Sequence, residues 1–124
     1  MRGPGHAPPY AVTHSAWTSL RAEQLSDRVT VRHLRGAASE ACWITIEAGG
    51  KLALPGLPAE CLLTVIEGRA RSFVLGNEVE LLKGHFAMLP PQLPFVLRAA
   101  GRSPTTLLLT CGASLGDSVA LEAE

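Results

Sequence analysis

The chain lacks several features that would place it in a specialised class of protein. Its 124 residues include only three cysteines, with no CxxC spacing, so we expect no disulfide framework. Eleven basic and eleven acidic residues cancel, and neither sign forms a long block, which disfavours a nucleic-acid partner. Apolar runs such as LLTVI and TTLLLTC are far shorter than the roughly 18–20 residues that span a bilayer, so no membrane partner is expected.

The N-terminal segment also lacks the apolar stretch of a secretory signal, because MRGPGHAPPY is interrupted by proline and glycine. We therefore expect a cytoplasmic protein. Residues 1–16 are interpreted as a flexible arm that is able to lie on a partner subunit. Residues 17–124 are interpreted as one domain, since a hydrophobic content of 47% suffices for a single core in a chain of this length.

The sequence is instead rich in short β-strand patterns. A helical turn is predicted over residues 17–27, and a C-terminal helix over residues 115–124. Between them, strand patterns recur at intervals of roughly 8–12 residues, each ended by Gly, Pro or Asn. They are VTVRHLRG, ACWITIEAGG, CLLTVIEG, ARSFVLGN, EVELLKG, HFAMLPP, PFVLRAAG and TTLLLTCG. With Gly76-Asn77 as a hairpin signal, this spacing predicts an all-β sandwich or small barrel of antiparallel strands.

Two glycines in this region, Gly49 and Gly68, stand at a spacing that carries a family resemblance. The segment from one to the other resembles the first motif of the cupins, G-x5-H-x-H-x3-E-x6-G. Aligned in this way, the two histidine positions of the motif fall on Pro55 and Leu57, and the glutamate position falls on Cys61. The resemblance implies a cupin-type jelly-roll barrel, also called a double-stranded β-helix.

The second cupin motif, G-x5-P-x-G-x2-H-x3-N, is matched in the same partial way. Gly84 and Pro90 agree with it, whereas Gln92, Phe95 and Ala99 replace the glycine, the histidine and the asparagine. The resemblance covers about residues 29–112. Positions that shape the backbone are kept, and positions that would hold the metal of the family are not.

These replacements remove the metal chemistry that the family would imply. Transition metals need imidazole, carboxylate or thiolate ligands, and Pro55, Leu57 and Phe95 offer none, so we expect no metal and no other cofactor. Shifting the strand by one residue would turn Leu62 inward and break the glycine match. A site built from relocated ligands is disfavoured; the histidines available to it are His6, His14, His33 and His85.

Five residues are candidates for the lining of the barrel. Leu57, Cys61 and Phe95 are ligand-binding candidates by motif position, and Trp43 is added from strand alternation. His33 shares the alternating face of Val29 and Val31, so it and Cys61 are weak catalytic candidates. For each of these residues, ordinary packing in the core is the competing interpretation.

The sequence thus favours a metal-independent cupin that binds a small, largely apolar metabolite in its barrel. Whether it is also a cofactor-free isomerase, cyclase or dehydratase stays open. The alternative is a non-catalytic dimerisation or regulatory module. Apolar residues on both faces of CLLTVI and TTLLLTC predict a homodimer in either case. An open cavity beside Cys61 and His33 would favour the first hypothesis.

Overall fold

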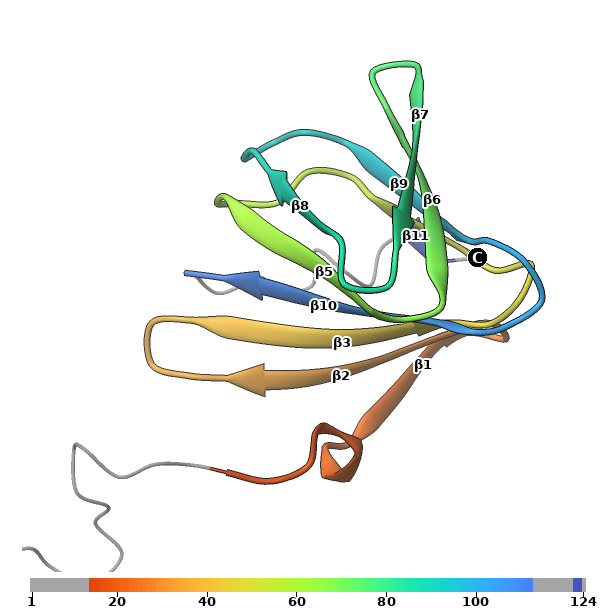
Figure 1. Cartoon of the computed structure of the whole chain (residues 1–124). Coiled ribbons are helices and arrows are strands. Elements are labelled where there is room, and N and C mark those ends of the chain that lie inside the picture. Colours follow the sequence, from red (N-terminus) through yellow and green to blue (C-terminus); the bar gives the residue numbers. More distant parts are fainter. Residues whose placement is uncertain (1–13, 113–121, 124) are drawn as a thin grey trace, which may run out of the picture.

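The computed structural model describes residues 14–112 and 122–123, and these residues form the all-β barrel that the sequence predicts. Its two sheets, of six and five strands, pack face to face, and every strand pairs with antiparallel neighbours (Figure 1). The larger sheet contains, in spatial order, β1 (Ala22–Ser26), β2 (Val29–Arg35), β3 (Glu40–Ile46), β10 (Thr105–Cys111), β5 (Cys61–Glu67) and β8 (Phe86–Leu89). The smaller contains β11 (Glu122–Ala123), β4 (Lys51–Leu54), β9 (Phe95–Ala99), β6 (Arg69–Val74) and β7 (Asn77–Leu82).

The central strands of the larger sheet show why this sequence folds into a barrel. Along β3 and β5, buried side chains alternate with half-buried ones, as expected when one face of a strand meets the core. Cys61, Leu63 and Val65 are at most 1% exposed. The neighbouring Leu62 is only half-buried, which confirms the register that the glycine spacing predicts.

The core lies between the two sheets and consists almost entirely of aliphatic side chains. The larger sheet contributes residues such as Ile44 and Leu107, and the smaller sheet contributes Leu52, Leu54 and Leu97, all at most 1% exposed. These residues form one continuous buried cluster. Burial of this surface is the main force that holds the sheets together.

The chain between Trp17 and Asp27 differs from the helical turn that the sequence predicts. Only Trp17–Ser19 is helical, as a single 3-10 turn, and β1 follows as an edge strand paired with β2. Pairing with β2 decides the conformation, because a short segment with weak helical periodicity gains more stability from hydrogen bonds to a neighbouring strand than from an isolated helical turn. Among the described residues, no helix is long and apolar enough to cross a membrane.

Two other predictions concern the ends of the chain. Most of the predicted arm, residues 1–13, lies outside the described residues, as do residues 115–121 and 124 of the predicted C-terminal helix. Residues 122 and 123 form strand β11, paired with β4, so the helix prediction is wrong for these two residues.

The predicted hairpin between β6 and β7 is present, with its turn one residue earlier than the Gly76-Asn77 signal indicates. Leu75 and Gly76 are the two central residues, with φ angles of 51° and 80°. Two positive φ angles are typical of the tight type I′ turn that matches the twist of paired strands.

Candidate functional site

The backbone around the cupin motif positions keeps the conformation that the glycine pattern predicts. Gly49, Gly68 and Gly84 all have positive φ angles, of 82°, 74° and 86°. At Gly68 a side chain is also excluded by space, since a Cβ atom would lie 2.4 Å from the carbonyl oxygen of Pro104. Gln92, which replaces the glycine of the second motif, still has a φ angle of 64°. This turn therefore has the left-handed conformation although glutamine stands where the motif has glycine.

The side chains at the motif positions form an apolar core instead of a metal site. Leu57, Cys61 and Phe95 are 2%, 1% and 4% exposed and belong to the same buried cluster. Pro55 is exposed. The structure thus brings together three of the predicted lining residues, and only the sulfur of Cys61 among them is a metal-ligand atom.

Cys61 lies opposite Cys111 in the pairing of β5 with β10. Its thiol donates a hydrogen bond to the carbonyl oxygen of Ala59 at 3.3 Å. Burial raises the pKa of the Cys61 thiol to about 12, and the neighbouring Cys111 thiol adds to the shift. Because the thiolate is the nucleophile and the thiol is not, this environment argues against Cys61 as a nucleophile near neutral pH.

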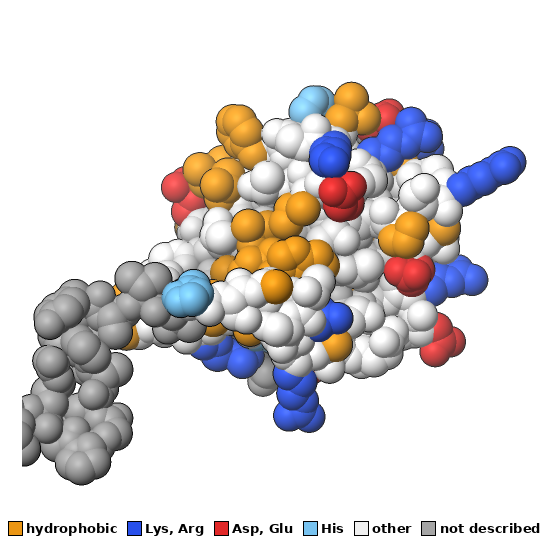
Figure 2. All heavy atoms as spheres, turned by 60° about the horizontal axis from the view of Figure 1, so that its bottom comes forward, with side chains coloured by type: hydrophobic (Ala, Val, Ile, Leu, Met, Phe, Trp, Pro, Cys, Tyr) orange, Lys and Arg blue, Asp and Glu red, His pale blue; other side chains and the backbone are white. Residues whose placement is uncertain are grey.

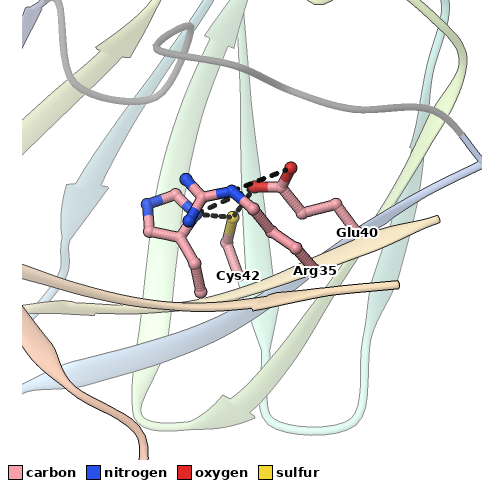
Figure 3. A network of polar contacts seen from close by, with 4 residues as sticks. Arg35, Glu40 and Cys42 are labelled. Carbon is pink, nitrogen blue, oxygen red and sulfur yellow. Dashed lines mark hydrogen bonds and ion pairs between the residues drawn. The ribbon is translucent and has the colours of Figure 1, made fainter. Parts of the chain in front are cut away.

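A polar cluster lies on the inner face of the adjacent strands β2 and β3. His33 has the inward orientation that alternation with Val29 and Val31 predicts, and its side chain is 10% exposed. Its Nδ1 atom lies 2.9 Å from Glu40 Oε2 and 3.1 Å from Cys42 Sγ. The thiol of Cys42 also approaches Glu40 Oε2 at 3.7 Å. Figure 3 shows this network reaching from the two strands into the barrel.

The hairpin register explains how these side chains meet. His33 pairs with Cys42 and Arg35 pairs with Glu40, so all four side chains share one face of the hairpin. The Glu40 side chain is 1% exposed, and its Oε1 atom lies 3.6 Å from Nε of Arg35. Burial raises the pKa of Cys42 to about 12, with the Glu40 carboxylate adding to the shift. In this state Cys42 is a neutral thiol beside a buried carboxylate.

A groove at the end of the β2–β3 hairpin leads toward this cluster. It has a volume of about 540 Å³ and is lined by residues from the ends of β2, β3 and β10, among them Arg35, Glu40, Thr110 and Cys111. Cys61 and His33 do not line it. Glu40 and Cys111 therefore border the groove, and it is not the cavity beside Cys61 and His33 that the sequence hypothesis requires.

A second, smaller cavity of about 200 Å³ opens beside Phe95, between β8 and the β6–β7 hairpin. Its other lining side chains are apolar, from residues that include Leu81, Met88 and Leu93. The exception is Ser72, which is 1% exposed and whose hydroxyl oxygen has no hydrogen-bond partner among the described residues. A buried hydroxyl without a partner is unfavourable, so this atom is available to hydrogen-bond a molecule in the cavity.

Trp43 does not lie in the barrel with the other candidates, which corrects the alternation assumed for β3. Glu40, Cys42 and Ile44 are buried on the inner face, and Trp43 is half-buried on the outer one. There its ring stacks on Trp17, with centroids 6.3 Å apart and planes 2° from parallel. The stack holds the N-terminal segment against the sheet.

Three polar residues of these sites are absent from the sequence candidates: Glu40, Cys42 and Ser72. The alternation of Cys42 with Ile44 and Ile46 is as regular as the one that places Trp43 inside, so it could equally have placed Cys42 inside the barrel. A hairpin with its turn at residues 36–39 (GAAS) would then pair Cys42 with His33. Nothing in the sequence singles out Ser72.

No protein-family model and no curated protein matches this sequence. Solved structures do match. The cupin domain of Schizosaccharomyces pombe Cnp3 is similar over 84% of this chain and 76% of that chain, with a TM-score of 0.71 and 14% sequence identity. A mutant of Bacillus subtilis oxalate decarboxylase OxdC is similar over 91% of this chain, with a TM-score of 0.73 and 17% identity.

The fold of this chain is therefore that of a cupin jelly roll, as the motif spacing predicts. The matched region spans about a third of the oxalate decarboxylase chain, 33%. At such low identity the similarity concerns the fold, and function has to be argued from the residues of this chain.

Proposed function

We propose that this protein is a cupin that binds a small, largely apolar molecule in its barrel, beside Phe95, without a metal at the motif positions. The observation that supports this proposal is the 200 Å³ cavity with its unpartnered Ser72 hydroxyl. An apolar pocket with one polar group is typical of small-molecule sites, in which carbon supplies affinity and the polar group fixes orientation.

The size of the cavity limits the molecule that it accepts. An apolar cavity of roughly 150 Å³ accommodates benzene, so about 200 Å³ suits one substituted ring or a short branched chain. Ser72 adds a requirement for one hydrogen-bonding group on the ligand. The lining residues include no titratable side chain, which favours binding over cofactor-free catalysis in this cavity.

Phenol and toluene form a matched pair for testing the proposal, because they have similar shapes and phenol has a hydroxyl where toluene has a methyl group. We expect phenol to raise the melting temperature of the protein more than toluene does, measured by calorimetry at equal ligand concentration. Replacing Ser72 by alanine should remove this preference, since the partner of the phenol hydroxyl is lost.

A second variant, Leu81→Phe, serves as the control because its larger side chain fills the cavity. It should abolish the effect of both compounds while the protein stays folded by circular dichroism. Equal effects of both compounds in the wild-type protein, or effects that survive Leu81→Phe, would contradict the proposal.

The outer face of the larger sheet favours a second candidate function, a homodimeric interaction module. Phe86 and Met88 on the edge strand β8 are 68% and 53% exposed. Leu62 lies beside Met88, and the row continues across the sheet through Thr110 and Ala41 to Leu34, which is 41% exposed, so Thr110 is its one polar member. Hydrophobic side chains also gather on the side below β2 and β3, which Figure 2 brings forward. Such exposed apolar surface is typical of protein interfaces.

A second copy of this chain is the proposed partner, since like-facing apolar rows on two copies can pack by two-fold symmetry. Phe86→Glu should convert a dimer to a monomer in analytical ultracentrifugation. The exposed Leu75→Glu, in the β6–β7 turn, is the matched control and should leave the dimer intact. A wild-type protein that sediments as a monomer would refute this candidate.

A further inference from the structure

The inner face of the β2–β3 hairpin carries a donor set that the proposed function does not use. We propose that His33, Glu40 and Cys42 bind a zinc ion, through one imidazole nitrogen, one carboxylate oxygen and the sulfur of Cys42, whose thiol proton the ion displaces on binding. None of the three occupies a cupin motif position, and all come from two strands that the motifs do not include. The proposal is independent of the apolar cavity, which lies beside Phe95.

The geometry of the three donor atoms supports this assignment. Their mutual distances are 2.9 Å between His33 and Glu40, 3.1 Å between His33 and Cys42, and 3.7 Å between Cys42 and Glu40. Around a tetrahedral zinc ion, ligand distances of about 2.0–2.3 Å place the same atoms roughly 3.3–3.6 Å apart. Movements of about half an ångström or less would therefore form the site, which is within the reach of side-chain rotation.

The surroundings of Glu40 also fit a metal ligand. Its Oε1 atom faces the guanidinium of Arg35 at 3.6 Å, and its Oε2 atom faces His33 and Cys42. A carboxylate held in this way by one oxygen presents the other in a fixed direction, as the partners of metal ligands do in known sites. An ion would also compensate the charge of a carboxylate whose side chain is only 1% exposed.

The groove of about 540 Å³ supplies the route by which an ion reaches the cluster. Glu40 itself lines the groove, together with Cys111, which lies opposite Glu40 in the strand pairing. Three protein ligands beside a groove leave the fourth position of a tetrahedral ion open to water or to a small molecule. That arrangement is characteristic of zinc sites that do chemistry, whereas structural zinc sites are closed by four protein ligands.

Cobalt titration of the full-length protein tests the site, because Co²⁺ takes zinc positions and absorbs light when bound to thiolate. After treatment with a chelator, we expect one Co²⁺ per chain and a thiolate-to-cobalt charge-transfer band that Zn²⁺ removes by displacement. Cys42→Ser should eliminate the band. Arg35→Gln should weaken binding by roughly 10–100-fold, the usual effect of losing a residue that orients a ligand.

Matched variants separate this site from other thiols and histidines. Cys61→Ser replaces another buried, free cysteine outside the cluster and should keep the band. A triple replacement of His6, His14 and His85 by alanine should also keep it. His33→Gln changes a side chain that is 10% exposed and should reduce affinity even if Cys42→Ser fails to fold.

Three results would overturn the proposal. They are the absence of a charge-transfer band at saturating Co²⁺, a band that persists in folded Cys42→Ser protein, and a band that disappears in the triple histidine variant.

Discussion

Two regions of the barrel lining differ sharply in the atoms that they bury. At the cupin motif positions, Leu57 and Phe95 bury carbon, and they need no partners beyond close packing. On β2 and β3, His33, Glu40 and Cys42 bury nitrogen, oxygen and sulfur within hydrogen-bonding distance of one another. The comparison teaches that backbone conformation and side-chain chemistry are separable in this fold. The turns of the cupin motifs are present, whereas the metal-ligand side chains of the motifs are replaced.

The carbon-lined region is expected to contribute more to stability than any exposed apolar residue. Leu57→Ala removes a side chain that is 2% exposed, which should lower the free energy of unfolding by about 2–5 kcal/mol in urea denaturation. Leu75→Ala, at a side chain that is 82% exposed, is the control and should change it by less than about 0.5 kcal/mol. Equal effects would mean that the motif positions are not a packed core.

Alkaline pH tests one buried thiol in each region, Cys61 at a motif position and Cys42 on β3. Burial holds the pKa of Cys42 and Cys61 at about 12, whereas a thiol in an unfolded chain has a pKa near 8.5. Above that lower value the unfolded chain releases protons that the folded chain retains, so stability falls as pH rises. Between about pH 8 and pH 10, Cys61→Ser should lose roughly 1–2 kcal/mol less than the wild-type protein in urea denaturation. Equal losses of stability in the two proteins would show that folding does not raise the pKa of Cys61.

Ser72 is the polar exception within the carbon-lined region. Removal of its hydroxyl should stabilise the ligand-free protein and weaken the binding of phenol. Ser72→Ala deletes a buried hydroxyl without a partner, so the free energy of unfolding of the ligand-free protein should rise by about 1 kcal/mol. The same variant should lose its preference for phenol over toluene. A destabilised ligand-free variant would indicate that the hydroxyl already has a partner in the folded protein.

The smallest expected effect concerns the backbone conformation of the turn that contains Gln92. Gln92 adopts a φ angle of 64° that costs a non-glycine residue strain, and its backbone N–H donates to the carbonyl of Leu57 at 2.9 Å. Gln92→Gly should therefore raise the free energy of unfolding by less than about 1 kcal/mol, since relief of strain is partly offset by chain entropy. Gln92→Val should lower it, because a branched side chain disfavours this conformation. Both are measured by thermal unfolding; equal shifts in the two variants would argue against strain.

Much of the fold could be predicted from local patterns, because turns and alternation are short-range properties. Gly49 and Gly68 set the register of β5, and alternation with Val29 and Val31 placed His33 inside the barrel. The four-residue strand β4 was not distinguished from a loop, since so short a segment gains its hydrogen bonds from β9, which is distant in sequence.

The candidate site was less predictable, because it depends on which residues face each other across strands. Alternation in β3 permits two orientations, and the one that places Trp43 inside is wrong. Glu40 gave no signal of its own, as a charged residue beside a turn is ordinarily solvated. Only the pairing of β2 with β3 brings its carboxylate to His33 and Cys42.

The stack of Trp17 on Trp43 determines what the intrinsic fluorescence of this protein reports. The chain has only two tryptophans, and both belong to this stack on the outer face of the sheet. Arg32 adds to it, since its guanidinium lies 5.8 Å from the Trp17 ring and donates to the carbonyls of Thr18 and Leu20. Tryptophan emission should therefore follow the detachment of the N-terminal segment, while circular dichroism follows the loss of the sheets. Recorded together, the two signals measure two separate events in one sample.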